Sequence, residues 1–223
     1  KYLPEIKRYD ISTVKGSVIV KDFSAEKFKM HLKSNKVNVI KILPGGVVTA
    51  KDTAEIQLDE NGEFVRNPEE DIVKVAVVER HQGTGNVACG FLKGYGIKAG
   101  AVALSIAHDS HNIIVVGVSD EEMEFAVNSL IAQEGGMVLV REGKVLESMP
   151  MPIAGLMSDQ SGEWVDEKLT AIHAKAYEEL GIAGDVEPVM TLCFMSLAVI
   201  PEVKLTDMGL FDVTTFSFIP VEA

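Results

Sequence analysis

Short runs of apolar, often β-branched residues bounded by turn residues make up much of this chain, and they predict strands. Asn61-Gly62 and Glu142-Gly143 separate neighbouring runs and indicate tight hairpins. The expected strands are VNVIKIL (37–43), VVTAKDTAEIQL (47–58), IVKVAVVER (72–80), AVALSIA (101–107), IIVVGV (113–118), MVLV (137–140), KVLES (144–148) and TLCFMSLAVI (191–200).

Helical periodicity appears in two longer segments. Ser119 and Glu122 form an S-x-x-E capping box, and the residues after them place apolar side chains on one helical face. A second amphipathic pattern covers residues 163–180 and ends at Gly181. The apolar positions are Met123, Ala126, Val127, Leu130 and Ile131 in the first helix, and Val165, Leu169, Ile172 and Ala176 in the second.

The first 35 residues are more polar and are expected to form an extension. It would hold a short strand at residues 18–20 and a short helix over residues 25–33, capped by Ser24. Residues 36–223 would form one α+β domain, in which two main amphipathic helices cover a mixed, largely antiparallel sheet. The proline-broken run MPMPIAGLM (149–157) is expected to cover part of that core.

Composition narrows the classes of partner. The chain has 21 basic and 33 acidic residues among 223, a formal net charge of −12, which argues against nucleic acid or an anionic membrane as partner. No apolar run approaches the ~18 residues of a membrane span. Only Cys89 and Cys193 are present, which suits a reducing cytoplasm. The chain begins without Met, so we expect a fragment of a longer protein.

The most concentrated polar chemistry is the run HDSHN at residues 108–112, between two buried strands. Ionisable groups are costly inside a sheet, so the run is expected on a connection where the strands emerge. His108 and His111 could ligate a metal with Asp109 if a turn brought them together, although a β context sends residues three apart to opposite faces. They could instead serve in acid–base chemistry or substrate contact. The third alternative is a capped turn with packed histidines.

A glycine-containing loop follows the strand that ends in Glu79, Arg80 and His81. The spacing Gly83-x-Gly85-x-x-Ala88 formally fits a dinucleotide fingerprint. Further glycines at positions 90, 94, 96 and 100 break up the helix that this fingerprint requires. We therefore expect the glycines to serve the conformation of the loop.

Four segments together resemble the C-terminal region of bacterial adenine deaminases, in the order found in that family. They are IVKVAVVERHQGTGN, GFLKGYGIKAGAVALSIAHDSHNIIVVG, MPMPIAGLMSD and VIPEVKLTDMGLFDV, and the similarity extends from about residue 36 onward. The resemblance implies an amidohydrolase-type enzyme that hydrolyses adenine to hypoxanthine and ammonia for purine salvage. A metal-bearing (β/α)8 barrel would precede this region and hold manganese or iron.

The barrel ligands of that family include an H-x-H pair, and this chain contains none. The chain is therefore expected to hold no metal and to be inactive alone, depending on a barrel domain of the same polypeptide. Within a cytoplasmic, homo-oligomeric enzyme, His108, Asp109 and His111 are the catalytic candidates. Glu79, His81 and Asn112 are the candidates for substrate contact. The alternatives are a structural or oligomerisation domain, built on residues 149–157 and the C-terminal tail, and a free-standing small-molecule binding module.

Overall fold

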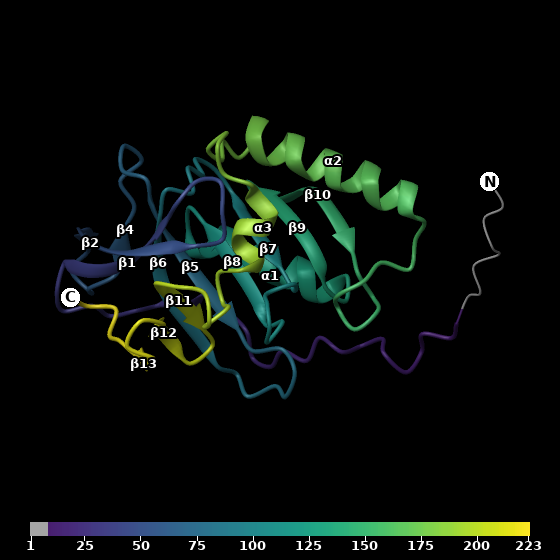
Figure 1. Ribbon diagram of the computed structural model, residues 1–223, viewed down its shortest axis with the longest axis horizontal. Helices are drawn as coiled ribbons and strands as arrows, with labels where there is room; N and C mark the ends of the chain where they lie inside the picture. Colours follow the sequence, from purple (N-terminus) through teal and green to yellow (C-terminus); the bar gives the residue numbers. More distant parts are fainter. Residues whose placement is uncertain (1–8) are drawn as a thin grey trace.

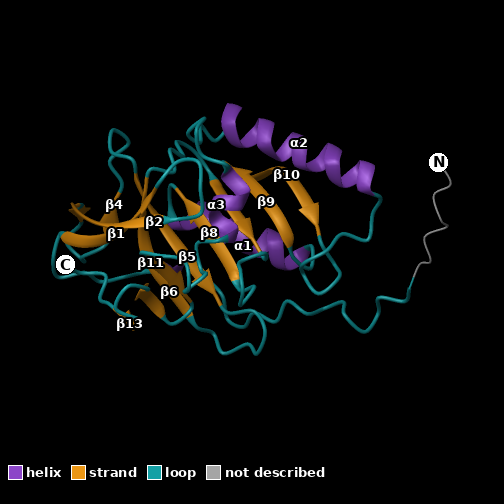
Figure 2. Cartoon of the chain, in the orientation of Figure 1, coloured by secondary structure: helices purple, strands orange, loops and turns teal. Residues whose placement is uncertain are grey.

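An eight-stranded mixed sheet runs through the computed structural model, which describes residues 9–223 (Figures 1 and 2). Its strand order is β10-β9-β7-β8-β5-β6-β1-β2, with β1 and β6 parallel and the other neighbours antiparallel. The strands are β1 (Lys36–Ile42), β2 (Thr49–Glu55), β5 (Ile72–Val78), β6 (Val87–Lys93), β7 (Ala101–Leu104), β8 (Ile113–Gly117), β9 (Gly136–Arg141) and β10 (Lys144–Pro150). The predicted α+β class with a largely antiparallel sheet is confirmed.

The two predicted amphipathic helices cover the sheet, and they lie on opposite faces of it. Side chains alternate along a strand, so Val75 and Val77 of β5 join the core beneath α2 (Gly162–Glu178), whereas Ala76 and Val78 join the core beneath α1 (Asp120–Ala132). Every residue of β5, β7 and β8 is buried, which explains why their sequences are almost entirely apolar. The exception is Lys74 of β5, whose Nζ donates to the Phe28 carbonyl and to Asp120. Within residues 9–223, neither helix is long and apolar enough to cross a membrane.

Smaller elements complete the domain. A three-stranded sheet contains β11 (Val203–Thr206), β12 (Gly209–Asp212) and β13 (Ser217–Phe218), and a two-stranded sheet contains β3 (Gln57–Leu58) and β4 (Phe64–Val65). The short helices are η1 (Ala25–Phe28) and α3 (Pro188–Cys193). Leu205 and Leu210 of the three-stranded sheet pack over Gly90 of β6, where a Cβ would lie 3.6 and 3.7 Å from their methyl carbons, an ordinary contact distance.

The N-terminal predictions are wrong in part. Residues 18–20 form no strand, although the Ile19 N–H donates to the carbonyl of Arg80 at 2.7 Å. The expected helix over residues 25–33 is only the single turn η1, and the Ser24 side chain makes no capping bond. The N–H groups of Met30 and His31 donate to the Glu63 carboxylate instead, at 3.1 and 3.0 Å, and this pulls the chain out of the helix.

One of the two predicted hairpins is also wrong in detail. Asn61-Gly62 lies in a longer loop over residues 59–63, because Asp59 Oδ1 accepts the N–H groups of Asn61 and Glu63. The expected strand over residues 47–58 is divided between β2 and β3. By contrast, Glu142 and Gly143 form the predicted two-residue turn between β9 and β10, both with positive φ (53° and 66°).

The strand expected over residues 191–200 is wrong, because these residues form the end of a helix and turns. Pro188 begins α3, the Glu187 carboxylate accepts the Met190 N–H, and turns follow Cys193. Leu192, Cys193 and Met195 are all buried in the core beneath α2. Val189, Leu192 and Cys193 are buried while Met190 is exposed, so the helix has one apolar face, but six residues are too few for that periodicity to stand out from a strand in the sequence.

Candidate functional site

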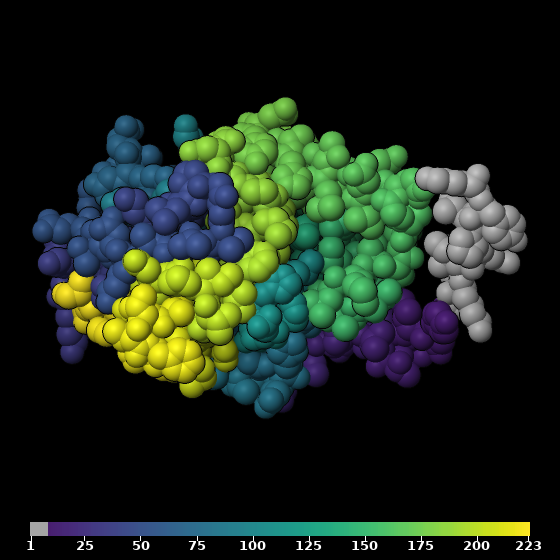
Figure 3. Space-filling model, viewed as in Figure 1, coloured from purple at the N-terminus to yellow at the C-terminus, as the bar shows by residue number. Residues whose placement is uncertain are grey.

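The predicted site residues lie on loops that meet at one edge of the sheet. Because β5 and β8 are antiparallel neighbours with Val78 opposite Ile113, the loop after β5 (79–86) adjoins the loop before β8 (105–112). The turn between β11 and β12 joins them from the other side. In Figure 3 the teal residues of the two loops border the yellow C-terminal segment on one face. The expected placement of the polar run on a connection between strands is confirmed.

Glu79 is buried and holds its own loop together. One carboxylate oxygen accepts the N–H groups of His81 and Gln82, and the other accepts the N–H and hydroxyl of Thr84, at 2.5 to 3.0 Å. Burial alone would raise the pKa of Glu79, but these hydrogen bonds outweigh it and bring the pKa to about 2. Glu79 is therefore an anion whose oxygens are occupied by the loop.

Arg80 is the residue that sequence reasoning missed. Only 1% of it is exposed, and its guanidinium donates to the carbonyls of His111, Ala154 and Ser17 at 2.5, 3.1 and 3.5 Å. Gly155 has a positive φ of 72°, and a Cβ there would lie 2.8 Å from Nη1 of Arg80. The arginine thus fastens three segments that are remote in sequence. Burial lowers its pKa, and the negative charge of Glu79 opposes this shift.

His81 and His108 anchor the HDSHN loop at its two sides. His81 is exposed, and its Nε2 lies 2.7 Å from the carbonyl oxygen of Ser110. The His108 N–H donates to the carbonyl of Cys193 at 2.8 Å, and its ring packs on Phe194 with 4.8 Å between centroids. Asp109 is exposed at the tip of the loop.

His111 is the most constrained member of this loop. Its φ is 54°, a left-handed conformation uncommon outside glycine, and its N–H donates to the carbonyl of Ala107 at 2.6 Å. Nδ1 is buried and has no hydrogen-bond partner among residues 9–223. Burial lowers the pKa of His111, and the nearby His108 and Arg80 lower it further. These effects all favour the neutral form of the imidazole.

Asn112 links the loop to the small sheet. It is buried, its Oδ1 accepts the Arg80 N–H at 3.3 Å, and its Nδ2 donates to Asp207 Oδ1 at 3.2 Å. On the same side, Asn86 Nδ2 lies 3.4 Å from the sulfur of Met208. Nothing in the spacing of the sequence pointed to Phe194, Asp207 or Met208 as neighbours of this loop.

A metal centre does not fit these residues. The rings of His108 and His111 pack edge to face, with 5.2 Å between their centroids. In the part of the chain that the structure describes, no three His, Cys, Asp or Glu side chains are grouped to hold an ion.

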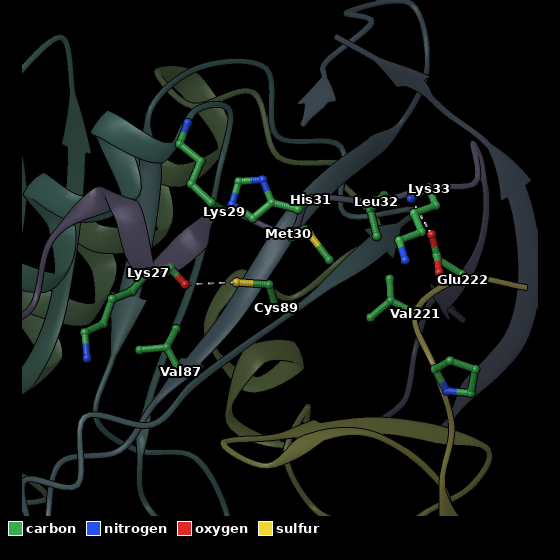
Figure 4. A pocket seen from close by; sticks show the side chains of 11 residues that line it. Lys27, Lys29, Met30, His31, Leu32, Lys33, Val87, Cys89, Val221 and Glu222 are labelled. Carbon is green, nitrogen blue, oxygen red and sulfur yellow. Dashed lines mark hydrogen bonds between the residues drawn. The ribbon is translucent and has the colours of Figure 1, made fainter. Parts of the chain in front are cut away.

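A cavity of about 350 Å³ lies elsewhere, beside η1 and the C-terminal end (Figure 4). Met30, Cys89 and Val221 give it an apolar wall, and Lys27 at its rim donates to the carbonyl of Gly85. Burial raises the pKa of Cys89 to about 12, so its thiol is protonated and a poor nucleophile. The cavity does not include the histidine loop.

Fold and site together define a mixed-sheet α+β domain with a histidine-bearing loop edge and no metal-ligand set among its described residues. Comparison with known proteins makes the assignment specific. The profile of the adenine deaminase C-terminal domain matches residues 46–217, and the chain belongs to this family.

Curated relatives agree with this assignment. The chain is 67% identical to adenine deaminase 2 of Desulfotalea psychrophila and 49% identical to adenine deaminase of Ligilactobacillus salivarius, with 100% of the chain covered in both. It is 47% identical over 95% of its length to adenine deaminase 2 of Carboxydothermus hydrogenoformans. The chain spans 39%, 38% and 37% of these three relatives, so each contains a larger part outside the region compared.

Proposed function

We propose that this domain works within a full-length adenine deaminase, which hydrolyses adenine to hypoxanthine and ammonia in purine salvage. The support is the family match over residues 46–217 together with relatives that carry this activity in their names. The enzyme would be a cytoplasmic homo-oligomer, and the two free cysteines suit a reducing compartment. Manganese or iron would be bound by the barrel domain of the same polypeptide and would activate water there.

The part assigned to this chain is the HDSHN loop, which would complete the substrate site at the mouth of the barrel. His111 carries this proposal, because a buried polar atom without a partner costs roughly 1–3 kcal/mol unless another group satisfies it. A neutral imidazole can accept or donate one hydrogen bond, which suits contact with the purine ring or its amino group. His108 and Asp109 flank that position, and His81 holds the loop from its other side.

The test is a set of single variants in the full-length enzyme, with adenine turnover and thermal midpoint measured for each. His108→Ala, Asp109→Ala and His111→Asn should retain the fold, and loss of an acid–base or orienting contact should lower turnover by ~10²–10⁴-fold. Asn tolerates the left-handed backbone of His111, so that variant removes the imidazole with little added strain.

His31→Asn is the matched control. His31 also has a positive φ (48°), but its side chain is 72% exposed and pairs with Glu63 far from the loop. It should leave turnover unchanged. Normal turnover in all three loop variants, with only the midpoint lowered, would mean that the loop is scaffolding. The alternative function is structural. It is favoured by the hydrogen bonds through which Glu79, Arg80 and Asn112 hold the loops together.

A further inference from the structure

The three-stranded sheet carries an exposed apolar surface next to the histidine loop. Met208, Phe216 and Phe218 are 66%, 74% and 56% exposed. The rings of Phe216 and Phe218 each pack edge to face on Phe211, at 5.2 Å between centroids. We call Met208, Phe211, Phe216 and Phe218 the aromatic face. Such a cluster of large apolar side chains on a surface is typical of an interaction site.

The aromatic face is separate from the core contacts of the same sheet. Leu205 and Leu210 approach Gly90 of the main sheet, while Phe211, the neighbour of Leu210, projects to the other side of β12. Phe218 lies opposite Phe211 across the β12–β13 pair, and a Cβ at Gly209 would be 3.7 Å from its ring. The rings are therefore held in place by a hydrogen-bonded hairpin, and a partner could pack on them without a change in the backbone.

The lack of charged residues around the aromatic face, and its place beside the HDSHN loop, indicate what covers it. Residues 213–221 carry no Asp, Glu, Lys or Arg in a chain that is 24% charged. At one end the face reaches the candidate site, since Met208 contacts Asn86 and its neighbour Asp207 binds Asn112. A partner seated on the aromatic face would thus also border the HDSHN loop.

We propose that the aromatic face docks the larger part of the same polypeptide, the portion that the relatives contain outside the region compared. That portion is about 60% of their length, since this chain spans 37–39% of them, and it is large enough to cover the face. The inference rests on the proposed function, because it requires the full-length enzyme. It explains why an uncharged, aromatic hairpin lies beside a polar loop that has one unsatisfied imidazole nitrogen.

Cysteine labelling of the full-length enzyme tests this docking. Phe218→Cys and Met208→Cys are each reacted with N-ethylmaleimide, folded and in urea, and the labelled peptides are followed by mass spectrometry. Val145→Cys on β10 and Val65→Cys on β4 are controls, with 46% and 43% exposure in the parent residues. Burial raises the pKa of Cys89 and of Cys193 to about 12, so these native thiols react slowly in the folded enzyme.

We expect labelling at positions 218 and 208 to slow more than tenfold on folding. Labelling at the exposed control positions 145 and 65 should slow by less than about threefold. Among the described residues, the Met208 side chain is hydrogen-bonded only by the Asn86 amide, and the bond from the Met208 N–H to Thr206 Oγ1 does not need the side chain, so Met208→Cys tests the proposal even if Phe218→Cys misfolds. Fast labelling at both positions overturns the proposal. Protection that disappears on dilution also overturns it, because the occupant is then a second copy. Adenine turnover is measured separately, so protection without turnover refutes the proposed function and leaves the docking intact.

Discussion

At the scale of single residues, the buried ions of this domain organise loops. Arg80 satisfies the carbonyls of three segments, and Glu79 satisfies the amides of its own loop. A charged group held by several backbone partners costs less to bury than an unpaired one, and its removal leaves those partners unsatisfied. His111 differs, because its own Nδ1 is the atom without a partner.

Glu79→Gln should therefore destabilise the chain in a pH-dependent way. The folded-state pKa of Glu79 is depressed from the ordinary 4.5 to about 2, so its contribution is present above pH 4.5 and is lost as the pH falls through about 2. We expect the variant to lose roughly 2 kcal/mol of unfolding free energy at pH 7 and to match the parent near pH 2. Urea denaturation across this range measures the difference. Glu60→Gln, on an exposed loop, is the control, and an equal loss at every pH would contradict the assignment.

At the scale of elements, close approach between strands decides where a side chain is forbidden. Gly100 and Gly143 have nearly the same positive φ, 67° and 66°. A Cβ at Gly100 would lie 1.9 Å from the carbonyl oxygen of Val140, whereas a Cβ at Gly143 meets nothing within 4 Å. A comparison of substitutions at the two glycines therefore distinguishes the cost of backbone strain from the cost of a steric clash.

Gly143→Ala should cost only the left-handed strain, about 1–2 kcal/mol. Gly100→Ala adds a clash with the backbone of β9, so we expect a loss of more than about 4 kcal/mol or failure to fold. Urea denaturation of the two variants, followed by circular dichroism, checks this. Similar losses would mean that β7 and β9 can separate locally at little cost.

At the scale of the whole molecule, the domain has an apolar core on each face of its main sheet. The sheet is covered on both faces by α1 and α2, while the described residues provide no set of three metal ligands. The purified 223-residue chain should therefore fold, yet neither release ammonia from adenine nor retain stoichiometric manganese. Ammonia release and elemental analysis, with the full-length enzyme as positive control, measure both. Saturable turnover by the chain, or one metal per chain that is lost in His111→Ala, would contradict the prediction.

The sequence by itself determined the elements whose signals are local. Runs rich in β-branched residues predicted β5 and β8, the capping box at Ser119 predicted the start of α1, and the turn at Glu142 and Gly143 predicted a hairpin. These features depend on residues that are close together in the sequence, so they can be recognised from the sequence alone. The position of the HDSHN run on a connection was likewise visible, because its polar residues could not remain inside a sheet.

Only the tertiary structure decided which distant groups meet. Residues 188–193 form a helix whose buried face packs on the core beneath α2, and Glu63 ends the first helical turn by accepting amides more than thirty residues away. The three carbonyls on Arg80, the bond from Asn112 to Asp207 and the contact of Asn86 with Met208 of the aromatic face join segments separated by up to 122 residues. Such contacts depend on the packing of the whole sheet, and no spacing pattern along the chain encodes them.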